Sequence, residues 1–270
     1  MKSLSCLAVF FLMLLGCKSS APLEDTIPAH ETLTVESKIL KEPRVINIWT
    51  PPNYSTISAQ FPVLYMADGG LKEDFPHIAN TLSNLIASNR IPPMILVGIE
   101  NTQRRRDLTG PTENEEDKKI APIVGGSEEF RAFIKDELFP IIEKKYRASA
   151  QKSIIGESLS GLFVVETFLK EPEMFDNYIA FDPSLWWNNH SLIQSASDDL
   201  AKFPAQKKRF WFAGSGTAGI SEYTAQLHEI LEKSDRSDIK WNYSPEPAEE
   251  HATIFRATKE KALIWTFGNK

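Results

Sequence analysis

The feature that most constrains this chain is a series of short runs, mostly continuous in apolar residues, that recur along its 270 residues. The runs cover residues 63–67, 94–99, 153–155, 178–181, 209–214 and 239–244. A strand with one face in water alternates apolar and polar residues, whereas a strand buried on both faces reads as a continuous apolar run. The pattern therefore predicts a mostly parallel central sheet with helices on both faces.

Helical periodicity separates these runs, most clearly over 127–146, where apolar residues recur on one face. Ser127 is the expected N-cap of this helix, and Pro140 is expected to kink it. Further helices are predicted near 78–88, 162–170, 223–233 and 255–267. Two segments rich in β-branched residues, 32–40 and 44–54, predict an N-terminal antiparallel hairpin that ends at Pro51 and Pro52. Without internal repeats, the pattern indicates one α/β domain over 31–270.

The N-terminus predicts export. An apolar stretch over 4–15 is too short for a membrane span and resembles the core of a secretory signal. It ends in "LLGC", which resembles the lipobox of bacterial lipoproteins, in which cleavage leaves a lipid-bearing cysteine. We expect a signal peptide over 1–16, lipidation of Cys17, a tether over 17–30 and a periplasmic, membrane-anchored location in the cell envelope. The alternative is an ordinary signal peptide.

The composition excludes several kinds of site and partner. The two cysteines are Cys6, inside the predicted signal, and Cys17, so the mature domain would have no thiol for a disulfide, a thiolate metal site or a nucleophile. The net charge of −6 disfavours nucleic acid as a partner. Neither an H-E-x-x-H motif nor clustered histidines occur, so no metal and no cofactor are expected.

One short motif indicates catalysis. The segment "GESLSG", 156–161, places Ser158 between a predicted strand and a predicted helix. A serine flanked by small residues at such a turn is the nucleophile elbow of α/β-hydrolases, because larger side chains two positions away would collide with the strand and helix. Here these positions hold Gly156 and Ser160, and Ser160 replaces the usual second glycine. The alternative is a plain Ser-Gly turn that opens a helix.

The expected partners of Ser158 follow from chain order, since in this fold the acid and then the histidine come after the nucleophile. His251 follows the last predicted strand, where the base belongs. The acid should follow the run at 209–214, and Glu222 is the carboxylate in that loop. Glu249 and Glu250 could instead orient His251 locally, although a solvated acidic loop is the simpler interpretation.

Two backbone N–H groups are needed to stabilise the oxyanion. Leu159, directly after the nucleophile, should supply one of them. The loop after the run at 63–67 should supply the other, because Gly69 and Gly70 permit close backbone approach. A plain tight turn is the alternative for this Asp-Gly-Gly sequence.

Several segments together resemble the "Putative esterase" family of α/β-hydrolases, which includes esterase D, enterochelin esterases and bacterial feruloyl esterases. The segments are "VLYMADGG", "VGIENTQRRRDLTGPTEN", "DELFPIIEKKYR", "GESLSGLFVVETFLKEPEMFDNYIAFDPSLWWNN" and "EEHATIF". The resemblance spans roughly residue 33 to the C-terminus and is most specific from the elbow to the paired tryptophans. It implies a serine hydrolase acting on esters, with Ser158 as nucleophile and His251 as base.

The same resemblance suggests pocket residues. Trp186 and Trp187 would line the substrate pocket, although packing under the loop is an equal alternative. Asp182 stands where many members have serine, and a carboxylate beside the pocket would change substrate preference. Arg106 lies in a run of arginines that is either solvated or, in a siderophore-type enzyme, in contact with an anionic substrate.

The function expected is hydrolysis of a carboxylic ester through an acyl-enzyme intermediate, with a siderophore ester or a carbohydrate ester as the candidate substrate. Two alternatives fit the same residues: acyl transfer to a sugar or lipid hydroxyl on the same fold, and a non-catalytic lipoprotein that binds a ligand in a decayed pocket. The oligomeric state is left open by the sequence.

Overall fold

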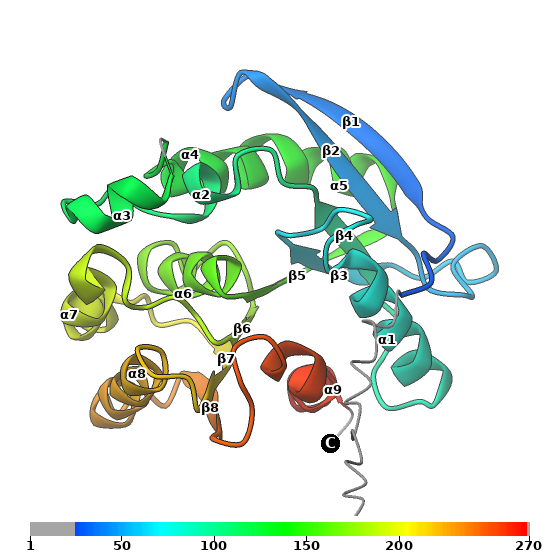
Figure 1. Ribbon diagram of the computed structural model, residues 1–270. Helices are drawn as coiled ribbons and strands as arrows, with labels where there is room; N and C mark the ends of the chain where they lie inside the picture. The colour runs from blue at the N-terminus through cyan, green and yellow to red at the C-terminus, as the bar shows by residue number, and fades with distance from the viewer. Residues whose placement is uncertain (1–24, 122, 269–270) are drawn as a thin grey trace, which may run out of the picture.

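The structure is a computed structural model that describes residues 25–121 and 123–268. Its centre is an eight-stranded sheet in the order β1-β2-β4-β3-β5-β6-β7-β8 (Figure 1). The strands are β1 (Glu31–Ser37), β2 (Glu42–Trp49), β3 (Phe61–Met66), β4 (Ile95–Ile99), β5 (Ala148–Glu157), β6 (Asn177–Phe181), β7 (Lys208–Ser215) and β8 (Ile239–Glu246). Strands β1, β2 and β4 pair antiparallel, and every pairing from β4 to β8 is parallel. The predicted mostly parallel sheet with an N-terminal hairpin is confirmed.

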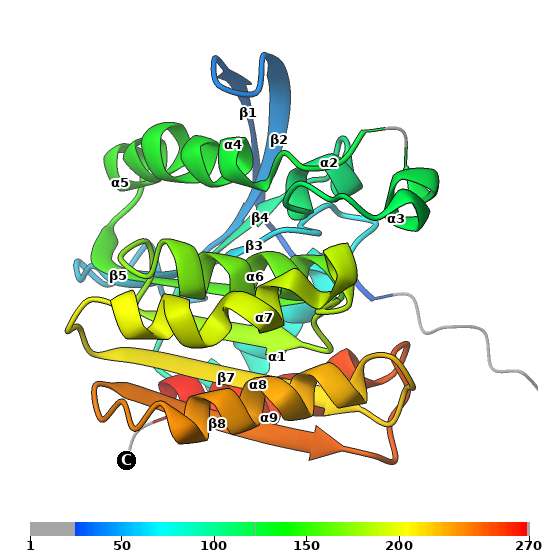
Figure 2. The same cartoon turned by 90° about the vertical axis from the view of Figure 1, so that its left-hand side faces the viewer.

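Helices cover both faces of the sheet. They are α1 (Phe75–Ala87), α2 (Arg104–Leu108), α3 (Glu115–Ile120), α4 (Ser127–Ala132), η1 (Phe133–Leu138), α5 (Phe139–Lys145), α6 (Leu159–Lys170), α7 (Trp187–Lys202), α8 (Ser221–Lys233) and α9 (Ile254–Phe267). Helices α1 and α9 pack on one face, and the α4–α5 run with α6, α7 and α8 packs on the other (Figures 1 and 2). The sequence did not indicate α2 or α3, which are only five and six residues long.

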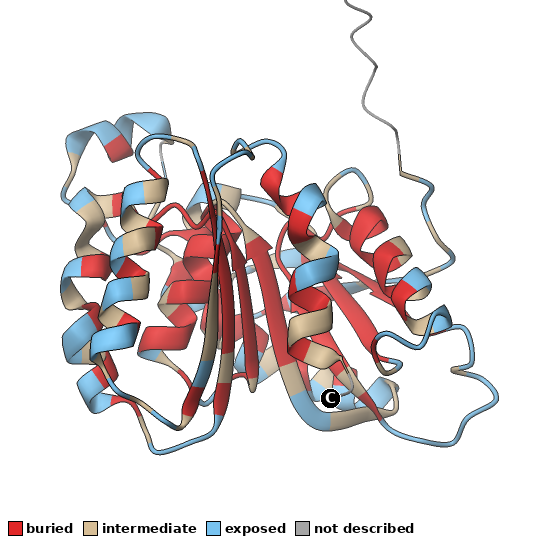
Figure 3. Ribbon diagram, turned by 90° about the horizontal axis from the view of Figure 1, so that it is seen from below, coloured by how far each residue is buried: buried red, intermediate tan, exposed pale blue. Residues whose placement is uncertain are grey.

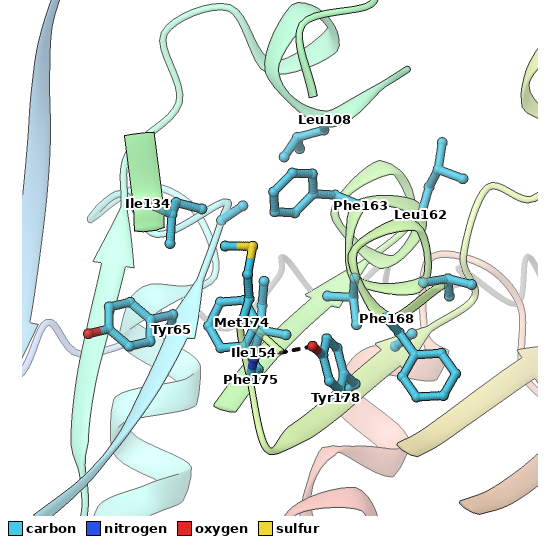
Figure 4. Close-up of a cluster of buried hydrophobic side chains, with 14 of the residues drawn as sticks. Tyr65, Leu108, Ile134, Ile154, Leu162, Phe163, Phe168, Met174, Phe175 and Tyr178 are labelled. Atoms are coloured by element: carbon cyan, nitrogen blue, oxygen red, sulfur yellow. Dashed lines mark hydrogen bonds between the residues drawn. The ribbon is translucent and has the colours of Figure 1, made fainter. Parts of the chain in front are cut away.

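The central strands are buried on both faces, as their continuous apolar runs predict (Figure 3). On the α6 side, Phe163 and Phe168 pack among aromatic residues of the sheet and its loops (Figure 4). Tyr178 of β6 is buried there with its hydroxyl satisfied, since it donates to Pro172 O at 3.1 Å and accepts from Phe175 N–H at 3.2 Å. This core holds the carboxyl ends of the strands rigidly side by side.

The long helix predicted over 127–146 is present, and the kink expected at Pro140 takes the form of a π-helical turn, η1, just before it. Proline lacks an N–H group, and its ring would clash with the carbonyl four residues earlier in a regular α-helix. A wider turn removes this clash while the chain remains helical.

Three local predictions differ from the structure. Ser127 is the first residue of α4 rather than its N-cap, which is Gly126. The hairpin ends at Trp49 rather than near Pro52. His190, expected in a loop, lies within α7, at a kink where residues 188–190 have left-handed backbone angles. Within the part of the chain that is described, no helix has both the length and the apolar character needed to cross a membrane.

Candidate active site

Ser158 occupies the corner between β5 and α6, with φ 60° and ψ −119°. This left-handed conformation is uncommon for a residue with a side chain and persists only where the surroundings enforce it. A Cβ at Gly156 would lie 2.5 Å from Ser160 O, and one at Gly161 would lie 2.9 Å from Phe181 O. Both positions therefore exclude side chains, and the predicted strand-turn-helix elbow is present.

Ser160, the departure from the usual glycine, is accommodated by hydrogen bonds within the corner. Its buried hydroxyl accepts from Glu157 N–H at 2.8 Å and donates to Glu157 O at 2.8 Å. The serine thus ties the turn to itself, and Gly161 provides the close approach to β6. A serine at this position is therefore compatible with the elbow.

His251 lies between β8 and α9, as the chain order predicts. Its Nε2 lies 3.0 Å from Ser158 Oγ, and its backbone N–H donates to Thr217 Oγ1 at 3.0 Å. With 36% of its side chain exposed, the imidazole is open to solvent on one side. The structure therefore brings Ser158 and His251, 93 residues apart, within hydrogen-bonding distance.

The carboxylate that contacts His251 is Asp182, not Glu222. Asp182 follows β6 directly, and its Oδ2 accepts from His251 Nδ1 at 2.7 Å. Its two oxygens also accept from Ser215 N–H at 2.6 Å and from Ser215 Oγ at 2.8 Å. Three donors thus satisfy this fully buried carboxylate. A charge inside a protein is tolerated only when it is hydrogen-bonded in this way.

The expectation for Glu222 is therefore wrong. This side chain is exposed at the start of α8, where it accepts from Gly219 N–H at 2.7 Å. The loop acids do not take its place: Glu249 accepts from Thr253 Oγ1 at 2.7 Å, and neither it nor Glu250 contacts the imidazole among the described interactions. The acid follows β6 instead of β7, one strand nearer to the nucleophile.

The same geometry corrects the expectation that Asp182 lines the substrate pocket. With its side chain wholly inaccessible, Asp182 can reach a substrate only through His251. Its hydrogen bond is the largest influence on His251, and it raises the pKa of the imidazole above the usual 6.5. The sequence did hold a signal for this role, namely an aspartate directly after a buried strand.

A second carboxylate lies on the other side of the imidazole. Glu157 Oε1 is 3.6 Å from His251 Nε2. Burial raises the pKa of Glu157 to about 7, with smaller increases from Asp74 and Asp68 that are opposed by His251 and Arg104. The sequence had shown this residue only as the neighbour of Ser158.

Of the expected oxyanion donors, Leu159 begins α6 directly after the nucleophile. The N–H of Gly69 already donates to Ile99 O at 3.0 Å, so this group is not available to a substrate. The N–H of Gly70 donates to Glu73 Oε2 at 2.6 Å, which makes it a donor at present occupied by a side-chain carboxylate. The Gly69 assignment is thus corrected, and Gly70 is the donor that a side-chain movement would free.

The two tryptophans expected to line the pocket have different environments in the structure. Trp187 is buried with its Nε1 donating to Gly110 O at 2.9 Å, and it lines a cavity of about 310 Å³ between α6 and α7 whose walls include neither Ser158 nor His251. Trp186 beside it is half-buried. Packing is therefore the better description of Trp187.

Arg106 is not free to receive a substrate, because its guanidinium contacts Glu42 Oε1 at 2.6 Å and Asp107 Oδ1 at 2.7 Å. Arg104 is the arginine whose charge lowers the pKa of Glu157, and Asp68 holds its guanidinium by two hydrogen bonds of 2.6 and 2.8 Å. The predicted signal peptide, the tether up to residue 24 and Cys17 lie outside the described residues.

Comparisons with known proteins identify the family of this chain. The model of the "Putative esterase" family matches residues 37–223. Ferri-bacillibactin esterase BesA of Bacillus subtilis is 30% identical over 266 residues, which cover 88% of this chain and 89% of that protein.

Two solved structures share the fold: an IroE-like serine hydrolase from Shewanella oneidensis (TM-score 0.81, 24% identity, 88% of this chain and 79% of that one) and the BES protein from Bacillus cereus (TM-score 0.79, 22% identity, 90% and 98%). The chain therefore belongs to the "Putative esterase" family and is a carboxylic ester hydrolase.

Proposed function

We propose that the chain is a serine esterase in which Ser158, His251 and Asp182 form the catalytic triad. The observation that carries this proposal is the unbroken chain of contacts from Ser158 Oγ to His251 Nε2, 3.0 Å, and from His251 Nδ1 to Asp182 Oδ2, 2.7 Å. Asp182 holds the Nδ1–H tautomer, so the lone pair of Nε2 faces the serine hydroxyl.

In the first half-reaction, Ser158 Oγ attacks the ester carbon and its proton passes to His251 Nε2. The tetrahedral intermediate collapses, the carbon–oxygen bond to the alcohol breaks, and the alcohol leaves with the proton from Nε2. Water then attacks the acyl-enzyme and gives a proton to Nε2, which returns it to Ser158 Oγ as the acid is released. Asp182 keeps its hydrogen bond to Nδ1 and stabilises the imidazolium.

The oxyanion would be stabilised by the N–H of Leu159 and by that of Gly70. The second group becomes available only when the Glu73 carboxylate leaves it. Burial raises the pKa of Glu73, so the charged form that holds this N–H is less favoured than it is for an exposed glutamate. Displacement of Glu73 would thus accompany binding of a productive substrate.

The substrate we propose is an ester of a siderophore or a carbohydrate. Similar proteins carry the names ferri-bacillibactin esterase and siderophore enterobactin esterase, the latter 39% identical to this chain over only 75 residues. A panel of siderophore lactones, feruloyl sugars and acetyl sugars would identify the class by its kcat/KM.

We also propose that the protein acts in the cell envelope, attached through a lipid on Cys17. The support is the sequence over 4–17, in which an apolar stretch ends in "LLGC". Metabolic labelling with a fatty-acid analogue should mark the wild-type chain and not Cys17→Ser. Equal labelling of both would remove this proposal and leave the esterase intact.

The catalytic assignment is tested with a neutral short-chain p-nitrophenyl ester. Ser158→Ala should abolish turnover and labelling by a fluorophosphonate probe, because among the described residues Ser158 has the one hydroxyl in hydrogen-bond contact with His251 Nε2. Glu222→Gln is the matched control, since this residue is exposed at the start of α8, and it should retain wild-type activity. Undiminished hydrolysis by a folded Ser158→Ala variant would overturn the assignment.

A further inference from the structure

We infer that Glu157 is a positioning residue that acts through His251: a second carboxylate, on the serine side of the imidazole, that sets the pH range in which the base works. This inference rests on the proposed function. Asp182 contacts Nδ1 at 2.7 Å, and Glu157 Oε1 lies 3.6 Å from Nε2. The imidazole therefore lies between two carboxylates, one on each nitrogen.

The two carboxylates differ in their own environments. Asp182 is fully buried and receives two hydrogen bonds from Ser215. Glu157 is 18% exposed, and among the described residues the imidazole Nε2 is the one group in hydrogen-bond or ion-pair contact with its side chain. Its carboxyl group is therefore bound less tightly, and its charge state responds to the proton on the imidazole.

The other charged groups nearby do not cancel this effect. Arg104, from α2, is a cation whose charge lowers the pKa of both Glu157 and His251, and Asp68 after β3 holds its guanidinium in two hydrogen bonds. Asp74, before α1, adds a negative charge that faces Glu157. Around the imidazole, the contacts with Asp182 and Glu157 outweigh the opposing charge of Arg104, which favours the protonated form.

The position of Glu157 has two consequences for the reaction. Before attack, an ionised Glu157 favours the imidazolium, so the base is lost to protonation at a higher pH than Asp182 alone would produce. During attack, the same charge stabilises the proton that arrives on Nε2, so the rate in the deprotonated range rises. Glu157 therefore lowers activity at acidic pH and raises it at neutral and alkaline pH.

Glu157→Gln tests this directly, because it removes the charge and keeps the shape. The measurement is kcat/KM against pH on a neutral p-nitrophenyl ester, so that the charge of the substrate contributes nothing. The acidic limb of the Glu157→Gln profile should shift to lower pH by about 0.5–1 unit, and its plateau value of kcat/KM should be about 3–10-fold below that of wild type. The wild-type and Glu157→Gln profiles should therefore approach or cross at low pH. The His251 resonance, followed by NMR, should titrate at a correspondingly lower pH.

Two further variants separate charge from structure. Glu157→Asp keeps the charge but draws it back from Nε2, so its acidic limb should fall between those of wild type and Glu157→Gln. Glu222→Gln removes an exposed carboxylate at the start of α8 and should leave the limb in place. Thermal melts identify any variant that fails to fold.

The outcomes distinguish this inference from the proposed function. If wild type hydrolyses the ester, Ser158→Ala does not, and the limb of folded Glu157→Gln is unmoved, then the role of Glu157 is overturned and the esterase remains. If wild type itself fails on neutral esters and is not labelled by a fluorophosphonate, the proposed function fails first.

Discussion

Two neighbouring corners of the sheet build the candidate site, one after β5 and one after β6. Glu157 pairs with Phe181 in the ladder, so Ser158 and Asp182 each stand one residue beyond the same rung. Both have positive φ, 60° and 44°, and each continues the ladder with its own N–H, Ser158 to Phe181 O and Asp182 to Ala213 O, at 3.0 Å in both cases. The two corners have similar geometry and present their side chains to opposite nitrogens of His251.

The corners differ in where their constraints come from. The residues that specify the β5 corner lie within six positions: Gly156 avoids a collision with Ser160 O, Ser160 bonds back to Glu157, and Gly161 leaves room for the neighbouring strand β6. The β6 corner is specified by Ser215 of β7, 33 residues further along the chain. A corner constrained locally leaves a motif in the sequence, whereas one constrained by another strand does not.

The strongest way to test the β6 corner is Asp182→Asn. Loss of the charge and of the Nδ1–H tautomer should lower kcat about 10³–10⁴-fold, as expected when a triad acid is neutralised. Steady-state kinetics on a p-nitrophenyl ester measure it. Glu222→Gln, the residue that the sequence favoured, should stay near wild type. If Glu222→Gln lost activity and Asp182→Asn kept it, the structural assignment of the acid would be reversed.

The β5 corner is tested by Gly156→Ala. The added methyl group would lie 2.5 Å from Ser160 O, a backbone atom that cannot turn aside, so we expect a loss of about 2–4 kcal/mol in the free energy of unfolding and of most activity. Denaturant titration measures this loss.

Gly219→Ala is the matched control for Gly156→Ala. It has φ +80° and nothing within 4 Å of a Cβ, so it should cost only about 1 kcal/mol of conformational strain. A Gly156→Ala variant no less stable than Gly219→Ala would contradict the steric account of the elbow.

The same contrast explains what the sequence could predict. The continuous apolar runs identified the strands of the parallel sheet because burial on both faces leaves a composition signal. The elbow was recognised from local sterics, and His251 from chain order. The acid was assigned to Glu222 because the usual chain order places it after β7. The local signal for the true acid was an aspartate directly after a buried strand, whereas the donors from Ser215 that hold it leave no pattern beside it.

One of the two glycines expected in the oxyanion loop was assigned wrongly for the same reason. Gly69 and Gly70 look equivalent in the sequence, since both permit close backbone approach. The structure separates them by their partners: Ile99 O of β4 takes the N–H of the first, and the Glu73 side chain takes that of the second. A donor's availability depends on residues elsewhere in the fold.

Ser215→Ala tests the distant constraint on Asp182 more gently. It removes the hydroxyl donor at 2.8 Å and leaves the backbone N–H at 2.6 Å, so one of two supporting hydrogen bonds remains. We expect kcat to fall roughly 10-fold, the equivalent of one hydrogen bond to a charged group. KM should change little, because Ser215 is buried away from solvent. A rise in KM with unchanged kcat would mean that Ser215 acts on substrate binding instead.

The smallest effect is expected for Ser160→Ala, which keeps the shape of the β5 corner and removes its internal hydrogen bonds. Glu157 N–H and O each lose a partner at 2.8 Å, in a part of the corner where Ser160 is almost wholly buried. The cost should be about 1–2 kcal/mol, a fall in Tm of roughly 2–8 °C, which a thermal melt records. Activity should stay within a few-fold of wild type, since Gly156 and Gly161 still enforce the turn at Ser158. A large loss of kcat at unchanged Tm would show that the β5 corner, like the β6 corner, depends on hydrogen bonds rather than on local sterics.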